Sequence, residues 1–176
     1  RTTNPSVATG DGLAMAVRAG ASSKDMAFFQ FHPTALMAQN KKPFLITEAL
    51  RGDGGVLLDS TGLEKYRMTD SSPDSFSFTL DFSEDGSLAT RDIVARACDQ
   101  KMKITGDDNV WLITDHLEQE NLHEHFPTIE GRLNKLGLSL GRDPLPVAPA
   151  AHYMVGGLSV DIHGRVLMED GNSMPG

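Results

Sequence analysis

The sequence predicts an α+β fold, because short apolar runs typical of buried strands alternate with longer stretches of helical spacing. The chain has 176 residues, 39% of them hydrophobic and 23% charged, which suits one globular core with fragments beside it. Strands are expected at 26–31, 44–46 and 110–113, at 56–62 together with a turn, and at 158–162. Helices are expected at 13–20, at 90–105 and, in two pieces, between 118 and 137.

The helix at 13–20 has small residues throughout, a polar start and a terminal Gly20, which predicts tight packing, an N-cap and a glycine C-cap. Asp11 stands at its mouth between two glycines. A plain N-cap is the simpler interpretation of Asp11. A helix N-terminus can bind an anion, but an acid in that position suits a hydroxyl or amine donor better.

The stretch from Gln30 to Gly55 places polar residues where two predicted strands end: His32 after the first, and Thr47 and Glu48 after the second. Glu48 and Arg51 are one helical turn apart, so a carboxylate and a guanidinium can share a face. Glycines then end the turn. A capped turn with a surface ion pair explains these residues as well as a site does.

Thr90 can cap the helix at 90–105, whose residues Ile93, Val94, Ala97 and Met102 point inward and which Gly106 stops. Arg91 then lies in the first turn, where the helix dipole opposes a cation. Asp92 could neutralise that charge. Alternatively, the guanidinium is aimed into a site, where its planar fork fits a carboxylate.

Less regular segments connect these elements. Residues 69–88 are rich in Ser and Asp and predict a surface loop with, at most, a short alternating strand. The proline-rich run at 144–149 predicts an extended connector. After Pro127, Ile129, Leu133 and Leu136 recur at helical spacing up to Gly137. A turn is expected at His163 and Gly164, and a loop at 170–176.

Composition excludes several functions. The net charge of −8 argues against binding nucleic acid or an anionic membrane, and no apolar run has membrane-spanning length. Cys98 is the only cysteine, so an internal disulfide and a thiolate metal site are both unsupported.

His116, His123 and His125 lie on a charged segment without a known ligand spacing, so we expect solvated side chains and no metal. The start at Arg1 suggests a piece of a longer protein.

Four motifs occur together in the chain: QFHPTAL (30–36), LITEALRGDGG (45–55), TRDIVARA (90–97) and PAAHYMVGG (149–157). In this order, with HFP (125–127) and PLPVAP (144–149), they resemble the succinate dehydrogenase/fumarate reductase flavoprotein family, and most of all its aspartate-oxidising branch. The resemblance covers nearly the whole chain except about 69–88, where the sequence departs from the family.

The resemblance implies FAD as cofactor and an architecture in three parts. A capping domain of an FAD-dependent oxidoreductase at 28–152 would be flanked by pieces of an α/β FAD-binding domain at 1–27 and 153–176. It also implies roles for seven residues. Arg91, Glu48 and Arg51 would be catalytic and could form a proton relay, His32, Thr47 and His152 would bind substrate, and Asp11 would lie against FAD.

The implied reaction oxidises L-aspartate to iminoaspartate, a step of NAD biosynthesis, with oxygen or fumarate reoxidising the flavin. A contact with quinolinate synthase and a cytoplasmic enzyme, or a plastid one in a plant or alga, also follow from the resemblance. Two alternatives stay open: a succinate dehydrogenase or fumarate reductase subunit, with succinate or fumarate as the dicarboxylate, and a non-catalytic cap or docking domain. The dinucleotide fingerprint is absent, so the isolated chain should bind FAD weakly and lack activity.

Overall fold

The computed structural model describes residues 1–38 and 43–175 and divides into two compact units. The larger unit comprises 1–3 and 31–150, and the smaller unit comprises 4–30 and 151–176. Residues 39–42, between the strands predicted at 26–31 and 44–46, and Gly176, at the end of the predicted loop, lie outside the described residues. The described part contains no helix long and apolar enough to cross a membrane.

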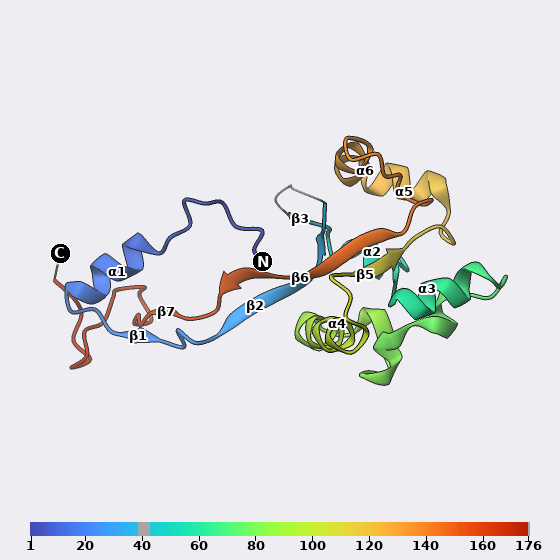
Figure 1. Cartoon of the computed structure of the whole chain (residues 1–176). Helices are drawn as coiled ribbons and strands as arrows, with labels where there is room; N and C mark the ends of the chain where they lie inside the picture. Colours follow the sequence, from blue (N-terminus) through green and yellow to red (C-terminus); the bar gives the residue numbers. More distant parts are fainter. Residues whose placement is uncertain (39–42, 176) are drawn as a thin grey trace. The chain divides into compact units, whose positions relative to one another are not determined.

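The larger unit is built on a five-stranded sheet of order β3-β2-β6-β5-β4. Its strands are β2 (Phe29–Leu36), β3 (Phe44–Leu45), β4 (Val56–Leu58), β5 (Val110–Ile113) and β6 (Leu145–Met154). The three pairs β2–β3, β4–β5 and β5–β6 are antiparallel. The strand order also makes neighbours of β2 and β6, which are far apart in sequence (Figure 1).

Helices surround this sheet: α2 (Ala49–Gly52), α3 (Ser60–Arg67), α4 (Arg91–Thr105), α5 (Gln119–His125) and α6 (Pro127–Asn134). Three 3₁₀ turns, η1 (Pro73–Phe76), η2 (Phe78–Asp81) and η3 (Gly86–Leu88), fill the segment between α3 and α4. The mixed helix and sheet composition predicted from the sequence is therefore confirmed.

Alternation along β4 and β5 divides the core between two apolar clusters. Leu57 and Leu112 belong to the main cluster, with residues of α4, α5, α6 and β6. Val56, Leu58 and Ile113 pack instead with Leu63 of α3. The helix predicted at 90–105 is confirmed, because Val94 and Ala97 are fully buried and Gly106 ends α4 with a φ of 78°. Thr90 occupies the N-cap position, but its hydroxyl donates to Asp92 and makes no capping hydrogen bond.

The smaller unit contains α1 (Asp11–Arg18) and a two-stranded ribbon of β1 (Ser23–Lys24) and β7 (Gly157–Leu158). Gly20 follows α1 with a φ of 100°, as a terminal glycine should. The tight packing predicted for this helix is wrong, because no residue of α1 is buried in the described chain. The predicted strand at 158–162 is also too long, since β7 stops at Leu158 and Val160 makes only an isolated bridge with Val166.

Two further predictions about strand ends are corrected. The strand predicted at 26–31 begins at Phe29 and continues to Leu36, so His32 lies inside it, not after it. The turn predicted after Leu58 is α3, whose first turn is capped by the Asp59 carboxylate accepting from the Gly62 amide at 2.6 Å. This N-cap hydrogen bond stabilises the first turn of the helix.

The predicted connector at 144–149 is the start of β6, a strand between two others in the sheet. Proline weakens such a strand by removing an N–H donor, but the Pro146 carbonyl still accepts from the Met37 amide at 2.8 Å. Leu145, Val147 and Ala148 are fully buried, so apolar burial offsets the missing donors.

Candidate functional site

Glu48 is the centre of a charged cluster in the larger unit. Its two carboxylate oxygens accept from two arginines: Oε1 from Arg51 Nη2 at 3.1 Å and Oε2 from Arg91 Nε at 2.6 Å. Glu48 precedes α2, Arg51 lies within it, and Arg91 begins α4 some 43 residues further along the chain. The shared helical face predicted for Glu48 and Arg51 is confirmed, and tertiary folding adds Arg91 to it.

Arg51 is the buried member of this cluster. Its side chain is 1% exposed, whereas those of Arg91 and Glu48 are 35% and 41% exposed. Arg51 Nη1 donates to the backbone carbonyls of Ser87 and Ala89, the latter at 3.5 Å. Among the described residues, Arg51 Nε has no hydrogen-bond partner. The interpretation as a surface ion pair is therefore wrong for Arg51.

The cluster alters the proton affinity of two of its members. Partial burial tends to raise the pKa of Glu48, but the hydrogen bond from Arg91 and the charges of Arg91, Arg51 and His32 outweigh it. The pKa of Glu48 consequently lies below its ordinary value. Burial lowers the pKa of Arg51, and the nearby Glu48 opposes that effect in part. Glu48 is thus held as an anion between two cations.

His32 lies in β2 beside this cluster and is 1% exposed. Its Nδ1 accepts from the Thr34 backbone amide at 3.3 Å, which leaves Nε2 as the ring nitrogen that can donate to another group. Thr34 itself is fixed, because its hydroxyl donates to the Ile46 carbonyl at 3.1 Å. Through Nε2 the buried imidazole can donate one hydrogen bond to a carboxylate.

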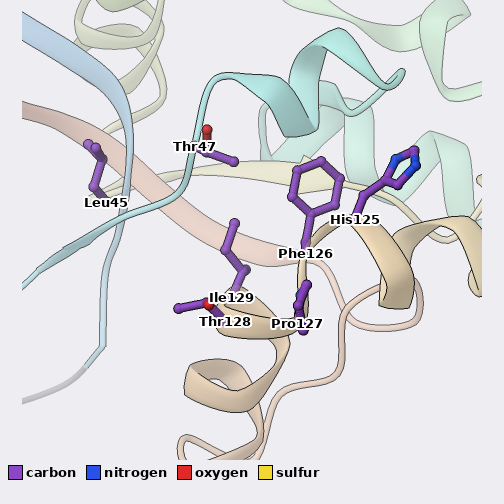
Figure 2. Close-up of a pocket in the computed structure, with 7 residues that line it drawn as sticks. All are labelled: Leu45, Thr47, His125, Phe126, Pro127, Thr128 and Ile129. Atoms are coloured by element: carbon purple, nitrogen blue, oxygen red, sulfur yellow. The ribbon is translucent and has the colours of Figure 1, made fainter.

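Thr47 lines a separate pocket of about 270 Å³, together with Leu45, His125, Phe126, Pro127, Thr128 and Ile129. Figure 2 shows this pocket between the segment that leads into α2 and the junction of α5 and α6. The Thr47 hydroxyl also accepts from the Ala49 amide at 3.3 Å, at the start of α2. The Thr47 side chain therefore lies one residue from Glu48 but lines a largely apolar pocket of its own.

His152 and Asp11 belong to the smaller unit. His152 is a half-buried residue of β6, and its ring meets that of Tyr153 edge to face at 5.3 Å. Asp11 is the exposed first residue of α1, and its carboxylate accepts from the Thr9 hydroxyl at 2.8 Å. The N-cap interpretation of Asp11 is wrong, because Gly10 occupies the N-cap position.

The start of α1 fits the edge of a polar cofactor. Gly10 adopts a φ of 77° without a side-chain cap, and apart from the adjacent residues and the helix backbone no described atom lies within 4 Å of a Cβ built at Gly10 or Gly12. The first amides of the helix are therefore accessible, and Asp11 can accept from a hydroxyl. FAD offers ribityl and ribose hydroxyls for that contact.

Arg96 and the three histidines of the predicted charged segment lie elsewhere in the larger unit. Arg96 pairs with Asp92 at 2.6 Å on the exposed side of α4, with a side chain 72% exposed. The three histidines of the rejected zinc site each have a partner of their own: the Gly54 carbonyl for His116, Glu130 for His123 and Asp53 for His125. They are paired and not merely solvated, and no group of metal-binding side chains occurs among the described residues.

Sequence reasoning missed the carbonyls of Ser87 and Ala89, which hold Arg51. Backbone oxygens carry no residue-type signal, and the segment that supplies them reads as a polar surface loop. Its one usable signal was the recurrence of Phe76, Phe78, Leu80 and Phe82. Phe78 is in fact 3% exposed, so the segment is anchored in the core and the loop interpretation is wrong there.

A family model described as FAD binding domain matches residues 1–176, and the chain belongs to this family of flavin-binding proteins. FAD is accordingly the cofactor that the chain helps to bind.

The chain is similar to named L-aspartate oxidases and to a solved fumarate reductase. The chain is 45% identical over 164 residues to L-aspartate oxidase from Yersinia pestis and 48% identical over 164 residues to L-aspartate oxidase 1 from Ralstonia nicotianae. Each alignment covers 93% of this chain and 28% of the relative, so the chain spans under a third of the relatives' length. A solved quinol fumarate reductase from E. coli matches with a TM-score of 0.74 at 29% identity, over 91% of this chain and 28% of that one.

Proposed function

We propose that this chain is a segment of a longer flavoenzyme that oxidises L-aspartate to iminoaspartate. The observation that carries the proposal is the Arg51–Glu48–Arg91 cluster, which holds one permanent cation in the interior and another at the surface. Such a cation suits a small dicarboxylate substrate. The identity of 45–48% to L-aspartate oxidases, against 29% to the fumarate reductase, favours L-aspartate over succinate.

In this proposal the larger unit is the capping domain and the smaller unit belongs to the FAD-binding domain. The boundaries of the units, near residues 30 and 151, support this division. Asp11 would contact FAD. When bound, FAD accepts the hydride and passes the electrons to oxygen or fumarate. A cytoplasmic or plastid location and a contact with quinolinate synthase stay predictions.

The residues of the larger unit would orient the substrate and manage its protons. Arg91 would bind a carboxylate through its guanidinium fork, and His32 through its Nε2–H. Thr47 would add a hydroxyl donor, and His152 of the smaller unit stays predicted as a further substrate ligand. Loss of the Cα hydrogen as hydride leaves a proton on the substrate nitrogen to be released. Arg91, Glu48 and Arg51, which are joined by the two hydrogen bonds to Glu48, would form the relay that carries this proton.

The test uses the full-length protein with L-aspartate and succinate as competing substrates. We expect turnover with L-aspartate, coupled to hydrogen peroxide formation or to fumarate reduction, and little oxidation of succinate. Preferred oxidation of succinate would support the second candidate, a fumarate reductase or succinate dehydrogenase subunit, which the structural similarity to the reductase favours. Flavin loading without either activity would contradict both.

Replacing His32 or His152 with alanine in the full-length protein is expected to raise the KM for the dicarboxylate roughly tenfold. The reason is that the substrate carboxylate would lose the hydrogen bond that the imidazole donates. FAD content should stay normal. Steady-state kinetics with flavin absorbance per protein measures both. His163→Ala is the control, because His163 lies at an exposed turn. Loss of FAD at unchanged KM would reassign the histidine to the cofactor.

A further inference from the structure

The segment between α3 and α4 carries three hydroxyls that the proposed reaction does not use: Ser77, Thr79 and Ser87. They lie against β4, which is the edge strand of the sheet. Leu57 of β4 pairs with Leu112 of β5, yet its own amide and carbonyl bond to this segment. An edge strand needs such partners, because its outer backbone groups have no neighbouring strand.

These contacts close into a ring. The Leu57 amide donates to Ser87 Oγ at 3.1 Å, and Ser77 Oγ donates to the Leu57 carbonyl at 2.9 Å. Thr79 Oγ1 lies 2.7 Å from Ser77 Oγ and 3.3 Å from Ser87 Oγ. Each hydroxyl has one proton, and that of Ser77 goes to the Leu57 carbonyl. Thr79 must therefore donate to Ser77, and Ser87 to Thr79, so the four bonds run in one direction from the Leu57 amide to the Leu57 carbonyl.

The ring fixes the residue whose carbonyl holds Arg51. Ser87 bonds to β4 and Thr79 through its hydroxyl, while its backbone carbonyl accepts from Arg51 Nη1. Thr79 is 1% exposed, so water cannot readily replace its hydroxyl. Gly86 supports the arrangement, because its φ of 53° turns the chain directly before Ser87. Bonds aligned in one direction also strengthen one another.

We propose that Thr79 is a positioning residue, which, through Ser87, holds the Arg51 guanidinium against Glu48 and thereby orients Arg91. This proposal rests on the proposed function for its kinetic consequence, but its structural part does not. The groups that face Glu48 are Arg51 of α2, Arg91 of α4 and His32 of β2, and Cys98 of α4 faces Arg51. Loosening Arg51 should let the pKa of Glu48 return toward its ordinary value.

The test compares Thr79→Val, which keeps the shape but removes the hydroxyl, with Thr79→Ser, which restores it, in the full-length protein. Thr69→Val is the matched control, because Thr69 is an exposed threonine of the same segment outside the ring. For Thr79→Val we expect the acid limb of the kcat/KM profile to move up by about half a pH unit and kcat to fall about tenfold. Thr79→Ser should recover most of both, and Thr69→Val should change neither.

A double-mutant cycle of unfolding tests the positioning role without any activity. The cycle compares the effect of Thr79→Val on the folding equilibrium constant in the wild-type protein and in Arg51→Met. The factor by which Thr79→Val lowers this constant should be about ten times smaller in Arg51→Met than in the wild-type protein. Equal losses in both backgrounds, with an unmoved acid limb, would overturn the proposal and leave Thr79 a core residue. If Thr79→Val does not fold, Ser77→Ala opens the same ring at a half-buried position. Because the cycle needs no substrate, it stays decisive even if the protein does not oxidise L-aspartate.

Discussion

Replacing Arg91 with lysine in the full-length protein is expected to lower turnover roughly 100-fold or more without unfolding it. Lysine keeps the charge but loses the planar fork, so it cannot donate through a side-chain Nε to Glu48 at 2.6 Å and also bind a carboxylate bidentately. The measurement is kcat per bound flavin, with circular dichroism and flavin absorbance to verify folding and loading.

Arg96→Lys is the control for this experiment. Five helical residues separate the two positions, which places them about 140° apart around α4. Arg96 faces solvent and pairs with Asp92, so its replacement should alter stability or FAD retention slightly and leave activity per flavin nearly unchanged. A large loss with Arg96→Lys, combined with a small one for Arg91→Lys, would refute the assignment of Arg91.

Replacing Arg51 with methionine is expected to lower the free energy of unfolding by about 3 kcal/mol. Methionine fills a similar volume, but the buried carbonyls of Ser87 and Ala89 then lose a donor and Glu48 loses one of its two cations. Urea unfolding of the full-length protein measures the difference. Arg142→Met serves as control, because Arg142 is 71% exposed and pairs with its neighbour Asp143 at the surface, and we expect a change within about 0.5 kcal/mol.

The pH dependence of this loss has a definite sign. The pKa of Glu48 is lower in the folded protein than in the unfolded chain, so its ion pairs stabilise the fold above the unfolded pKa. That contribution disappears as the pH falls through the folded pKa. The deficit of Arg51→Met should therefore shrink in acid, leaving the part caused by the unpaired carbonyls. A deficit that grows in acid would contradict the proposed pairing.

Local patterns in the sequence predicted the mixed α+β class, the helix that carries Arg91, and the shared helical face of Glu48 and Arg51. These features depend on local spacing: apolar residues at helical intervals define α4, and a separation of three residues places Glu48 and Arg51 on one face. The motif order also indicated the flavoprotein family, which the match of the FAD binding domain model confirms.

The tertiary structure shows the contact between Arg91 and Glu48, which local spacing did not indicate and only the family resemblance implied. It also shows that a segment read as a surface loop buries Phe78 and supplies the carbonyls that hold Arg51. It also placed the prolines of β6 inside the sheet, where burial of Leu145 and Val147 outweighs two missing amide donors. Contacts across more than 30 residues depend on how helices and strands pack in the tertiary structure, and backbone carbonyls have no residue type. No local pattern can therefore encode them.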